Sequence, residues 1–399
     1  MQESPTSDGN GAISPVEPSS SSSSSCYEPL EPRFQVRVTQ PIKDGTIVKY
    51  TLRVKQRDGM RMLDSKEKLE RSVERTYEDF EWLHHSFLTH VDTAGLIVPP
   101  LPPRPIVKPH DAQSKSKKQL GNSSKVVIAD EFYKDCKSLE RYLKQLAGHS
   151  VFGNDPVLER FLTETKHLPR SWVKKGLLDK LSTAMDGAKK MGHQDIDDYF
   201  QNEWTAANKY SACIRQASDS FNKMVYSQQR LAGAYCHLAT TLNIGGSCTD
   251  SRNTAAFYRL LVALAEALDD GKQGLDVDVF NDESTLGFHL DLTKRYTDSL
   301  KEMLYGRTCL LINYEDANRA LSKAKPNKVA AAEEAKKSVE QAFEACSETA
   351  RRELKDYHRE RIFVFQEALT VYAEAKITTA RDTYALLAKS LTHFKQFTG

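Results

Sequence analysis

The sequence lacks the features that mark secreted and membrane-spanning proteins. Its seven cysteines are scattered, odd in number and never in a Cys-x-x-Cys pair, which is typical of reduced thiols in a cytosolic protein. The N-terminus has no signal-peptide pattern. The longest apolar run, Leu260 to Leu268, is interrupted by Glu266 and is too short to span a bilayer. We therefore expect a cytoplasmic protein that contacts membranes only peripherally.

The chain also lacks an excess of charge of one sign and any familiar catalytic motif. Its 56 basic and 54 acidic residues leave a net charge of +2, so we expect no nucleic-acid partner. It has no dinucleotide-binding or phosphate-binding glycine loop, no nucleophile elbow and no zinc-protease motif. The adjacent His84 and His85 would point apart on a helix, without further ligands at metal spacing. We predict that the protein is not an enzyme and needs no metal or cofactor.

Residues 1–33 are rich in Ser, Pro, Glu and Gly and include the run Ser19–Ser25. Such a mixture cannot bury enough apolar surface to offset the chain entropy lost on folding. We expect this segment to be a disordered tail.

Alternating apolar and polar residues begin directly after this tail. The alternation covers Phe34–Val38 and Ile47–Val54, with Gly45 in a turn between them, and a third run passes through Ser72–Arg75. This pattern predicts a three-stranded antiparallel meander.

Helical spacing follows the predicted strands. Asp79 is expected to cap a helix that carries Phe80 and Leu83, and further helices are predicted over about 130–147 and 156–165. The proline-rich stretch 98–105 must be extended, because proline lacks the N–H donor and disfavours helix in the residue before it. Residues 34–167 are thus predicted to form one α+β domain.

Beyond residue 169 the apolar residues recur at alternating steps of three and four over unusually long stretches. Breaks at Asn243–Gly246 and Lys325–Asn327 divide the region into three helices of roughly 50–70 residues, about 75–105 Å long. A weaker break at Asp269–Gly271 is a candidate kink. One chain can hardly cover all the apolar seams of such a coil, so we predict a dimer. A plain cytoskeletal coiled coil is the alternative.

Four segments carry a resemblance to a known family. The segments Arg75–Leu83 and Ala94–Pro102 resemble the core of PX domains, the phosphoinositide-binding folds of sorting nexins. The segments Met303–Thr308 and Tyr314–Leu321 resemble the helical BAR region of PX-BAR sorting nexins. The resemblance covers about residues 34–398, and it is strongest to the subgroup of sorting nexins five, six and thirty-two.

This resemblance implies a multidomain fold, an α+β PX domain followed by an all-α three-helix BAR coiled-coil dimer. The predicted parts are the tail 1–33, the PX domain 34–167, an amphipathic membrane-binding linker helix 168–193 and the BAR domain 194–399. The implied function is non-enzymatic endosomal sorting. Such a protein tubulates curved membranes and recruits transmembrane cargo tails for retrograde trafficking. Its expected place is peripheral, on early endosomes and endosomal tubules.

The implied partners are acidic phospholipid membranes, with phosphoinositides among the candidate lipids, receptor cytoplasmic tails, and a second PX-BAR sorting nexin in a homo- or heterodimer. A phosphoinositide-binding PX adaptor and a cytoskeletal adaptor that does not bend membranes are the alternatives.

The lipid pocket departs from the family pattern. Members that bind phosphatidylinositol-3-phosphate carry Arg directly before the Tyr, because a guanidinium grips a phosphate bidentately, and Thr76 stands there instead. Tyr77 and Arg104 match the family. Asp135 falls where a further Arg is expected, although an alignment one residue earlier gives Lys134. We predict a degenerate phosphoinositide pocket, which comprises Arg75, Thr76, Tyr77, Arg104 and Asp135.

The same subgroup resembles a peptide receptor, in which cargo tails add a strand beside the sheet. Phe132 and Glu140 align with the residues of that groove. An ordinary core residue and a solvated charge are equally good interpretations of the two. The segment Ile106–Ala129 is shorter than the helical hairpin of the subgroup, which leaves the completeness of the groove open.

The segment 170–191 combines an apolar arc with a net charge of +4, a pattern that favours a helix lying in an acidic headgroup layer. A helix packed between two domains is the alternative. The predicted membrane-inserting residues are Trp172, Val173, Leu177, Leu178, Leu181 and Met185. The predicted electrostatic contacts are Lys174, Lys175, Lys180, Lys189 and Lys190, together with Lys323, Lys325 and Lys328 at the tip between the second and third long helices.

Overall fold

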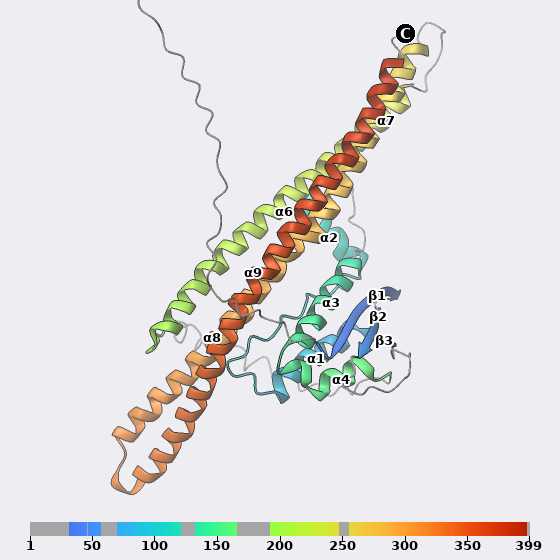
Figure 1. Cartoon of the computed structure of the whole chain (residues 1–399). Helices are drawn as coiled ribbons and strands as arrows, with labels where there is room; N and C mark the ends of the chain where they lie inside the picture. Colours follow the sequence, from blue (N-terminus) through green and yellow to red (C-terminus); the bar gives the residue numbers. More distant parts are fainter. Residues whose placement is uncertain are drawn as a thin grey trace, which may run out of the picture.

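The computed structural model describes residues 32–45, 47–56, 70–120, 132–165, 192–246 and 255–396. Figure 1 shows a small domain with a sheet lying against the side of a long helical rod. These two parts correspond to the α+β domain and the three long helices that the sequence predicts.

The sheet has three antiparallel strands, β1 (Phe34–Asp44), β2 (Ile47–Gln56) and β3 (Glu70–Thr76), in the order β1-β2-β3. The alternation of apolar residues puts Val36, Leu52 and Val73 into one buried core. The predicted meander is confirmed. Since β1 lies at one end of the order, it is an edge strand.

In the described part of the small domain the helical elements are α1 (Tyr77–His90), α2 (Pro109–Leu120), α3 (Phe132–Gly148), the 3₁₀ turn η1 (Phe152–Asn154) and α4 (Pro156–Thr163). The cap of α1 corrects our prediction, because Thr76 rather than Asp79 is the N-cap residue. The Asp79 carboxylate accepts hydrogen bonds from the Thr76 backbone N–H (2.8 Å) and hydroxyl (3.0 Å), three residues back. Helix α2 was not predicted.

The rod consists of α6 (Asp198–Gly246), a second long helical run and α9 (Val329–Gln396). The second run comprises α7 (Ala255–Asp282), the π-helical turn η2 (Glu283–Gly287) and α8 (Phe288–Ser322). The short 3₁₀ turn η3 (Pro326–Lys328) joins α8 to α9. Both helices of the α8–α9 hairpin extend past the start of α6 to one end of the rod (Figure 1). The predicted break at 325–327 is confirmed, whereas residues 243–246 are still helical and form the end of α6.

The irregularity in the second run lies at η2, not at Asp269–Gly271, which is regular helix within α7. The physical reason lies in two hydroxyls. Ser284 and Thr285 donate to the backbone oxygen of Asn281 at 3.3 and 2.6 Å, and such side chains compete with the helical ladder.

The small domain is fixed to the rod at two places. At η2, Lys134 of α3 pairs with Glu283, and Lys137 donates to the backbone oxygen of Ser284. At the second place, Ile97 is buried in the rod's core beside Leu300. The two domains therefore share buried contacts rather than lying side by side on a free tether.

Gly95 marks the closest approach at the second place. A Cβ atom there would lie 2.5 Å from the backbone oxygen of Cys346 and 2.9 Å from the nitrogen of Ala350, both on α9. Gly95 also has φ of 83°, a conformation that glycine adopts without strain. Glu353, one turn further along α9, accepts from the Ile97 N–H (3.3 Å) and contacts His149 Nε2 (3.1 Å).

Candidate functional site

Arg104, the one basic residue of the predicted lipid pocket that matches the family, already has two acidic partners. Its guanidinium donates to Glu78 at 2.8 Å and to Glu81 at 2.5 Å, both on α1. It lies 5.1 Å from the centre of the Tyr77 ring. The Tyr77 hydroxyl donates to the backbone oxygen of Pro102 at 2.5 Å, and burial raises the pKa of Tyr77 to about 12. A phosphate would have to compete with two carboxylates for this guanidinium.

The Arg75 side chain makes its contacts inside the domain. Its side chain is buried, and its guanidinium donates to the backbone oxygens of Phe161 (3.0 and 2.7 Å) and Glu164 (2.5 Å) at the end of α4. Burial lowers its pKa from the usual value. Arg75 therefore ties β3 to α4, while Thr76 beside it serves as the helix cap.

Asp135 adds a further negative charge on the first turn of α3. Burial raises the pKa of the Tyr50 hydroxyl in the domain core, and the Asp135 carboxylate raises it further. Arg104 is thus the one cation of the five predicted pocket residues that is not buried. Its two neighbouring acids are Glu78 and Glu81, and Asp135 adds a negative charge near Tyr77.

The predicted cargo groove lies where α3 meets the edge strand β1. Glu140 accepts the Val38 backbone N–H at 3.0 Å through one oxygen and the Lys144 ammonium at 2.5 Å through the other. Phe132 packs against the domain core, with the Lys43 ammonium 5.8 Å from its ring centre. Glu140 is therefore not a solvated charge, because it holds a backbone donor of the edge strand.

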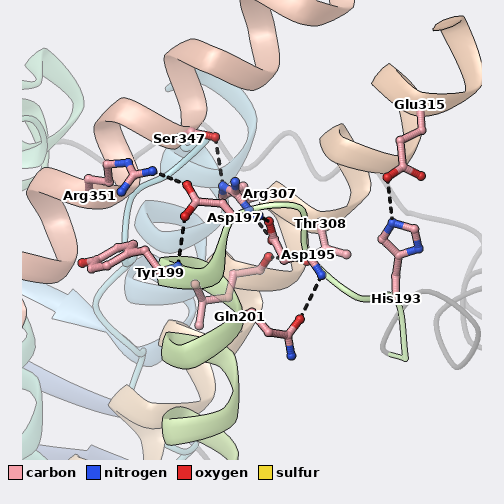
Figure 2. Close-up of polar contacts among 11 residues, drawn as sticks. His193, Asp195, Asp197, Tyr199, Gln201, Arg307, Thr308, Glu315, Ser347 and Arg351 are labelled. Carbon is pink, nitrogen blue, oxygen red and sulfur yellow. Dashed lines mark hydrogen bonds and ion pairs between the residues drawn. The ribbon is translucent and has the colours of Figure 1, made fainter.

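A buried cation links the start of α6 to α8 and α9 (Figure 2). The Arg307 guanidinium pairs with Asp195, and its Nε donates to the Ser347 hydroxyl at 2.9 Å. It lies 3.5 Å from the ring centre of Phe200 and 4.9 Å from that of Phe343. Arg307 is 2% exposed, and removing one partner of such a buried ion pair costs about 3–5 kcal/mol.

Further polar contacts fix residues 193–201 to the same two helices. Asp197 pairs with Arg351 of α9. It also accepts the Tyr199 backbone N–H at 3.0 Å, which is the contact expected of a carboxylate at the N-terminus of a helix. His193 contacts Glu315 of α8 at 3.2 Å (Figure 2). The chain directly after the predicted linker helix is thus anchored on the rod.

Large exposed apolar residues gather on one half of the rod. They come from the second half of α6, from α7 and from the second half of α9. Among the residues that the structure describes, α8 and the α9 stretch 329–361 contribute none. The set comprises Met224, Leu231, Leu238 and Ile244, then Phe257, Leu260, Leu264, Val277 and Phe280, and finally Ile362, Phe363, Phe365, Leu369, Val371, Ile377, Tyr384, Leu387 and Leu391. We call this set the apolar half.

The comparisons with known proteins agree with both parts of the fold. The family model "PX domain" matches residues 63–165, and the model "Vps5 C terminal like" matches residues 174–389. The chain is 31% identical to sorting nexin-6 of Homo sapiens, over 90% of this chain and 91% of that protein. It is 28% identical to sorting nexin-32 of Mus musculus, over 91% of this chain and 93% of that protein. The chain is a PX-BAR sorting nexin.

A solved structure supports the same fold. A chain of the SNX-BAR Mvp1 tetramer, determined by cryo-EM, matches with a TM-score of 0.53 at 15% identity, over 90% of this chain and 100% of that chain. Membership of the sorting nexins indicates a membrane-associated trafficking role. The PX domain indicates phosphoinositide lipid binding, and the BAR-like domain indicates dimerisation. PX-BAR sorting nexins are generally non-enzymatic adaptors.

The remaining predicted membrane contacts are only partly covered by the structure. Lys323, Lys325 and Lys328 are exposed at the end of the α8–α9 hairpin. Every predicted residue of the linker helix, from Trp172 to Lys190, lies outside the described residues. No described helix is long and apolar enough to cross a bilayer. The described residues hold no cluster of three or more His, Cys, Asp or Glu side chains suited to a metal ion.

Sequence reasoning missed the roles of Arg307 and of the two acids beside Arg104. The sequence contains a feature that could have indicated each of these roles. Arg307 occupies a position of the apolar series in the second long helix, where a buried charge needs a partner. Glu78 and Glu81 lie within the motif Arg75–Leu83, three residues apart, so both carboxylates share one helix face.

Proposed function

We propose that this sorting nexin dimerises through the apolar half of its rod, then binds acidic endosomal membranes and tubulates them. The observation that carries the proposal is the segregation of exposed large apolar side chains into one half of the rod, because among the described residues of the rod Ile196, just before α6, is the one such side chain outside that half. Contiguous exposed apolar surface on a soluble protein marks an interaction site. A second BAR chain would cover it.

A groove at one end of the apolar half supports this assignment. It has a volume of about 760 Å³, and its walls are mainly apolar side chains of α6, α8 and α9. Ile214, Tyr296 and Phe365 are among its lining residues. A partner helix that entered this groove would extend the three-helix packing of one chain into a larger bundle.

Membrane contact is assigned to two basic elements. Lys323, Lys325 and Lys328 are exposed at the tip and form no ion pair with an acid among the described residues. Each would contribute about 1 kcal/mol near an anionic leaflet. The linker helix 168–193 would add apolar insertion, which wedges one leaflet apart. The anchor at residues 193–201 supports the proposal, because force on an inserted helix would pass directly to α8 and α9.

Cargo recruitment is assigned to the edge of the PX sheet. Strand β1 offers its outer edge to an extended peptide, and α3 lies beside it with Glu140 and Phe132. An incoming tail would compete with Glu140 for the Val38 N–H. We propose that receptor tails bind here and are carried into tubules for retrograde transport.

The test compares the wild type with a variant in which Ile362 and Phe363 are both replaced by Ser. These side chains are 64% and 60% exposed, so the variant should fold. We expect light scattering to show a dimer for the wild type, alone or with a sorting nexin-2 chain, and a monomer for the variant. Liposome co-sedimentation and negative-stain imaging should show tubules with the wild type only.

A matched control replaces Ala330 and Ala331, both exposed near the tip of the same helix, by Ser. It should behave as the wild type. A wild-type monomer in the presence of sorting nexin-2 would contradict dimerisation. A dimer that ignores acidic liposomes would instead favour the cytoskeletal adaptor.

A further inference from the structure

A cleft between the PX domain and α8 is not used by any of the surfaces proposed above. One wall comprises the end of α1 and the following loop, the other wall is α8, and Cys346 of α9 contributes at the base. Its volume is about 690 Å³, which lies within the range of roughly 300–1,000 Å³ typical of ligand sites. None of its lining residues belongs to the lipid pocket, the cargo groove, the apolar half or the tip.

The walls of the cleft are held in place before any ligand arrives. Gly95, in the loop wall, lies against the backbone of α9, and Ile97 of the same loop is buried beside Leu300. The Ile97 N–H also donates to Glu353. A ligand would therefore bind without first ordering the two domains, which lowers the entropy cost of binding.

The cleft combines apolar side chains with an excess of acids. Leu88 is 49% exposed at the cleft and Leu310 lines it from α8, whereas Met303 of the lining is 5% exposed and belongs to the core of the rod. The charged lining residues are Asp92, Arg295, Asp298 and Glu302. Arg295 Nε donates to Asp291 at 3.0 Å, while its buried Nη1 has no hydrogen-bond partner among the described residues. Asp298 pairs with Arg215, outside the cleft, at 2.5 Å.

Asp92 and Glu302 are left without a cation among the residues that the structure describes. Asp92 accepts only the Ala94 backbone N–H, at 3.0 Å. Glu302 lies one turn from Asp298, and desolvation, followed by the repulsion of Asp298, raises its pKa. A cation placed here would relieve this repulsion, whereas an anionic lipid headgroup or a phosphopeptide would increase it.

We propose that the cleft binds a short peptide segment of a partner protein that pairs a large apolar side chain with a Lys or Arg. The apolar side chain packs against Leu88 and Leu310, and the cation lies toward Glu302 and Asp92. This site is separate from the edge of β1, so the protein can hold a partner there and a cargo tail at the sheet together.

The experiment measures fluorescence polarisation with the full-length chain. The probe is a labelled peptide of alternating Leu and Lys between Gly ends, and its counterpart carries Glu in place of each Lys. We expect saturable binding of the Lys peptide only. Glu302→Lys should raise its Kd by about tenfold or more, equivalent to about 1.4 kcal/mol, and Leu88→Ala should weaken binding as well.

The matched control is Glu333→Lys, which makes the same charge change at an exposed position of α9 outside the cleft and should leave Kd unchanged. Equal binding of the Glu peptide would overturn the proposal, as would a Glu302→Lys variant with wild-type affinity. A change of oligomeric state in that variant without peptide would make the cleft a subunit contact instead and would equally overturn it. The peptide-binding outcomes do not depend on whether the chain dimerises through the apolar half or tubulates membranes.

Discussion

At the scale of single residues, what a charge can bind depends on the partners that it already has. Arg104 matches the family position for a phosphate ligand, yet Glu78 and Glu81 hold its guanidinium. The tip residue Lys325 carries the same charge without such a pair. Because exposed ion pairs are worth only about 0–1 kcal/mol, the acids weaken a phosphate contact without abolishing it.

This balance predicts how the lipid pocket responds to mutation. The wild-type chain should bind soluble phosphatidylinositol-3-phosphate weakly or not at all. Replacing Glu78 and Glu81 by Gln keeps the helix face polar but frees Arg104, and affinity should rise by about threefold to tenfold. Isothermal titration calorimetry is the measurement.

The control adds Arg104→Ala to the double Gln variant and should remove the gain. Micromolar binding by the wild type that is lost on Arg104→Ala alone would contradict the prediction, because it would show a working pocket.

Two histidines predict a loss of stability in mild acid. Burial, with the neighbouring His85, lowers the pKa of His84 from 6.5 to about 4, and burial together with the charge of Arg141 lowers that of His289 to about 4. Above pH 6.5 both rings are neutral in the folded and the unfolded chain. Between pH 6.5 and about 4 the unfolded chain binds the protons first, so stability falls as pH falls.

Thermal unfolding across this pH range should therefore show a falling midpoint. His84→Gln should make the slope shallower while retaining a hydrogen bond to Tyr142, whose hydroxyl lies 3.2 Å from His84 Nδ1. An identical slope for wild type and His84→Gln would refute this assignment.

At the scale of elements, the sequence predicts the strands and helices whose apolar residues recur with a regular period. The strands follow from alternation that continues into the core at Val36 and Leu52, and the long helices follow from apolar residues spaced three and four apart. The break before α9 follows from Pro326. These signals are local, so a single sequence suffices for them.

The elements that were missed depend on partners far along the chain. Helix α2 has almost no apolar residues of its own, and Gln119 bonds Tyr226 of α6 at 3.0 Å. Its Ser116 is 1% exposed. The π turn η2 depends on two hydroxyls and on the docking of α3. The pairing of Asp195 with Arg307, 112 residues apart, could not be assigned from spacing alone.

The linker helix predicts a separation between membrane binding and tubulation. Replacing Leu177, Leu178 and Leu181 by Ser removes the apolar insertion, in which each fully buried side chain is worth about 1.5–3 kcal/mol. Tubules should disappear from acidic liposomes, while dimerisation measured by light scattering should stay intact. If the triple Ser variant still made tubules of normal width and number, segment 170–191 would instead be a linker packed between the two domains.

Charge reversal at the tip should have a different signature. Replacing Lys323, Lys325 and Lys328 by Glu should weaken co-sedimentation and reduce its salt dependence, because screened attraction is lost while insertion remains. Unchanged binding at low salt would show that the tip does not touch the membrane.

At the scale of the whole molecule, the PX domain acts as part of the rod. Ile97 is buried among residues of α6, α8 and α9, and Lys134 pairs with Glu283 at the opposite end of the contact. A sheet fixed in this way holds the edge of β1 at a constant orientation relative to the rod. The proposed cargo groove and the proposed membrane contacts would therefore be geometrically linked in one chain.

Gly95→Ala tests this linkage, with Gly45→Ala as its matched control. Both glycines have positive φ, 83° and 61°, so either substitution strains the backbone by about 1–3 kcal/mol. A Cβ atom at residue 45 meets nothing within 4 Å, whereas one at residue 95 would lie 2.5 Å from the Cys346 oxygen. The two variants thus share the strain and differ only in the clash between the domains.

We expect both variants to keep a folded PX domain and a folded rod by circular dichroism. Hydrogen exchange should rise at residues 346–354 and around Ile97 only in Gly95→Ala, because only there does the loop have to move off α9. Small-angle scattering should show a larger radius of gyration for that variant alone. Equal exchange in the two variants would mean that the contact at Gly95 does not hold the domains together, and Lys134 with Glu283 would then be the principal attachment.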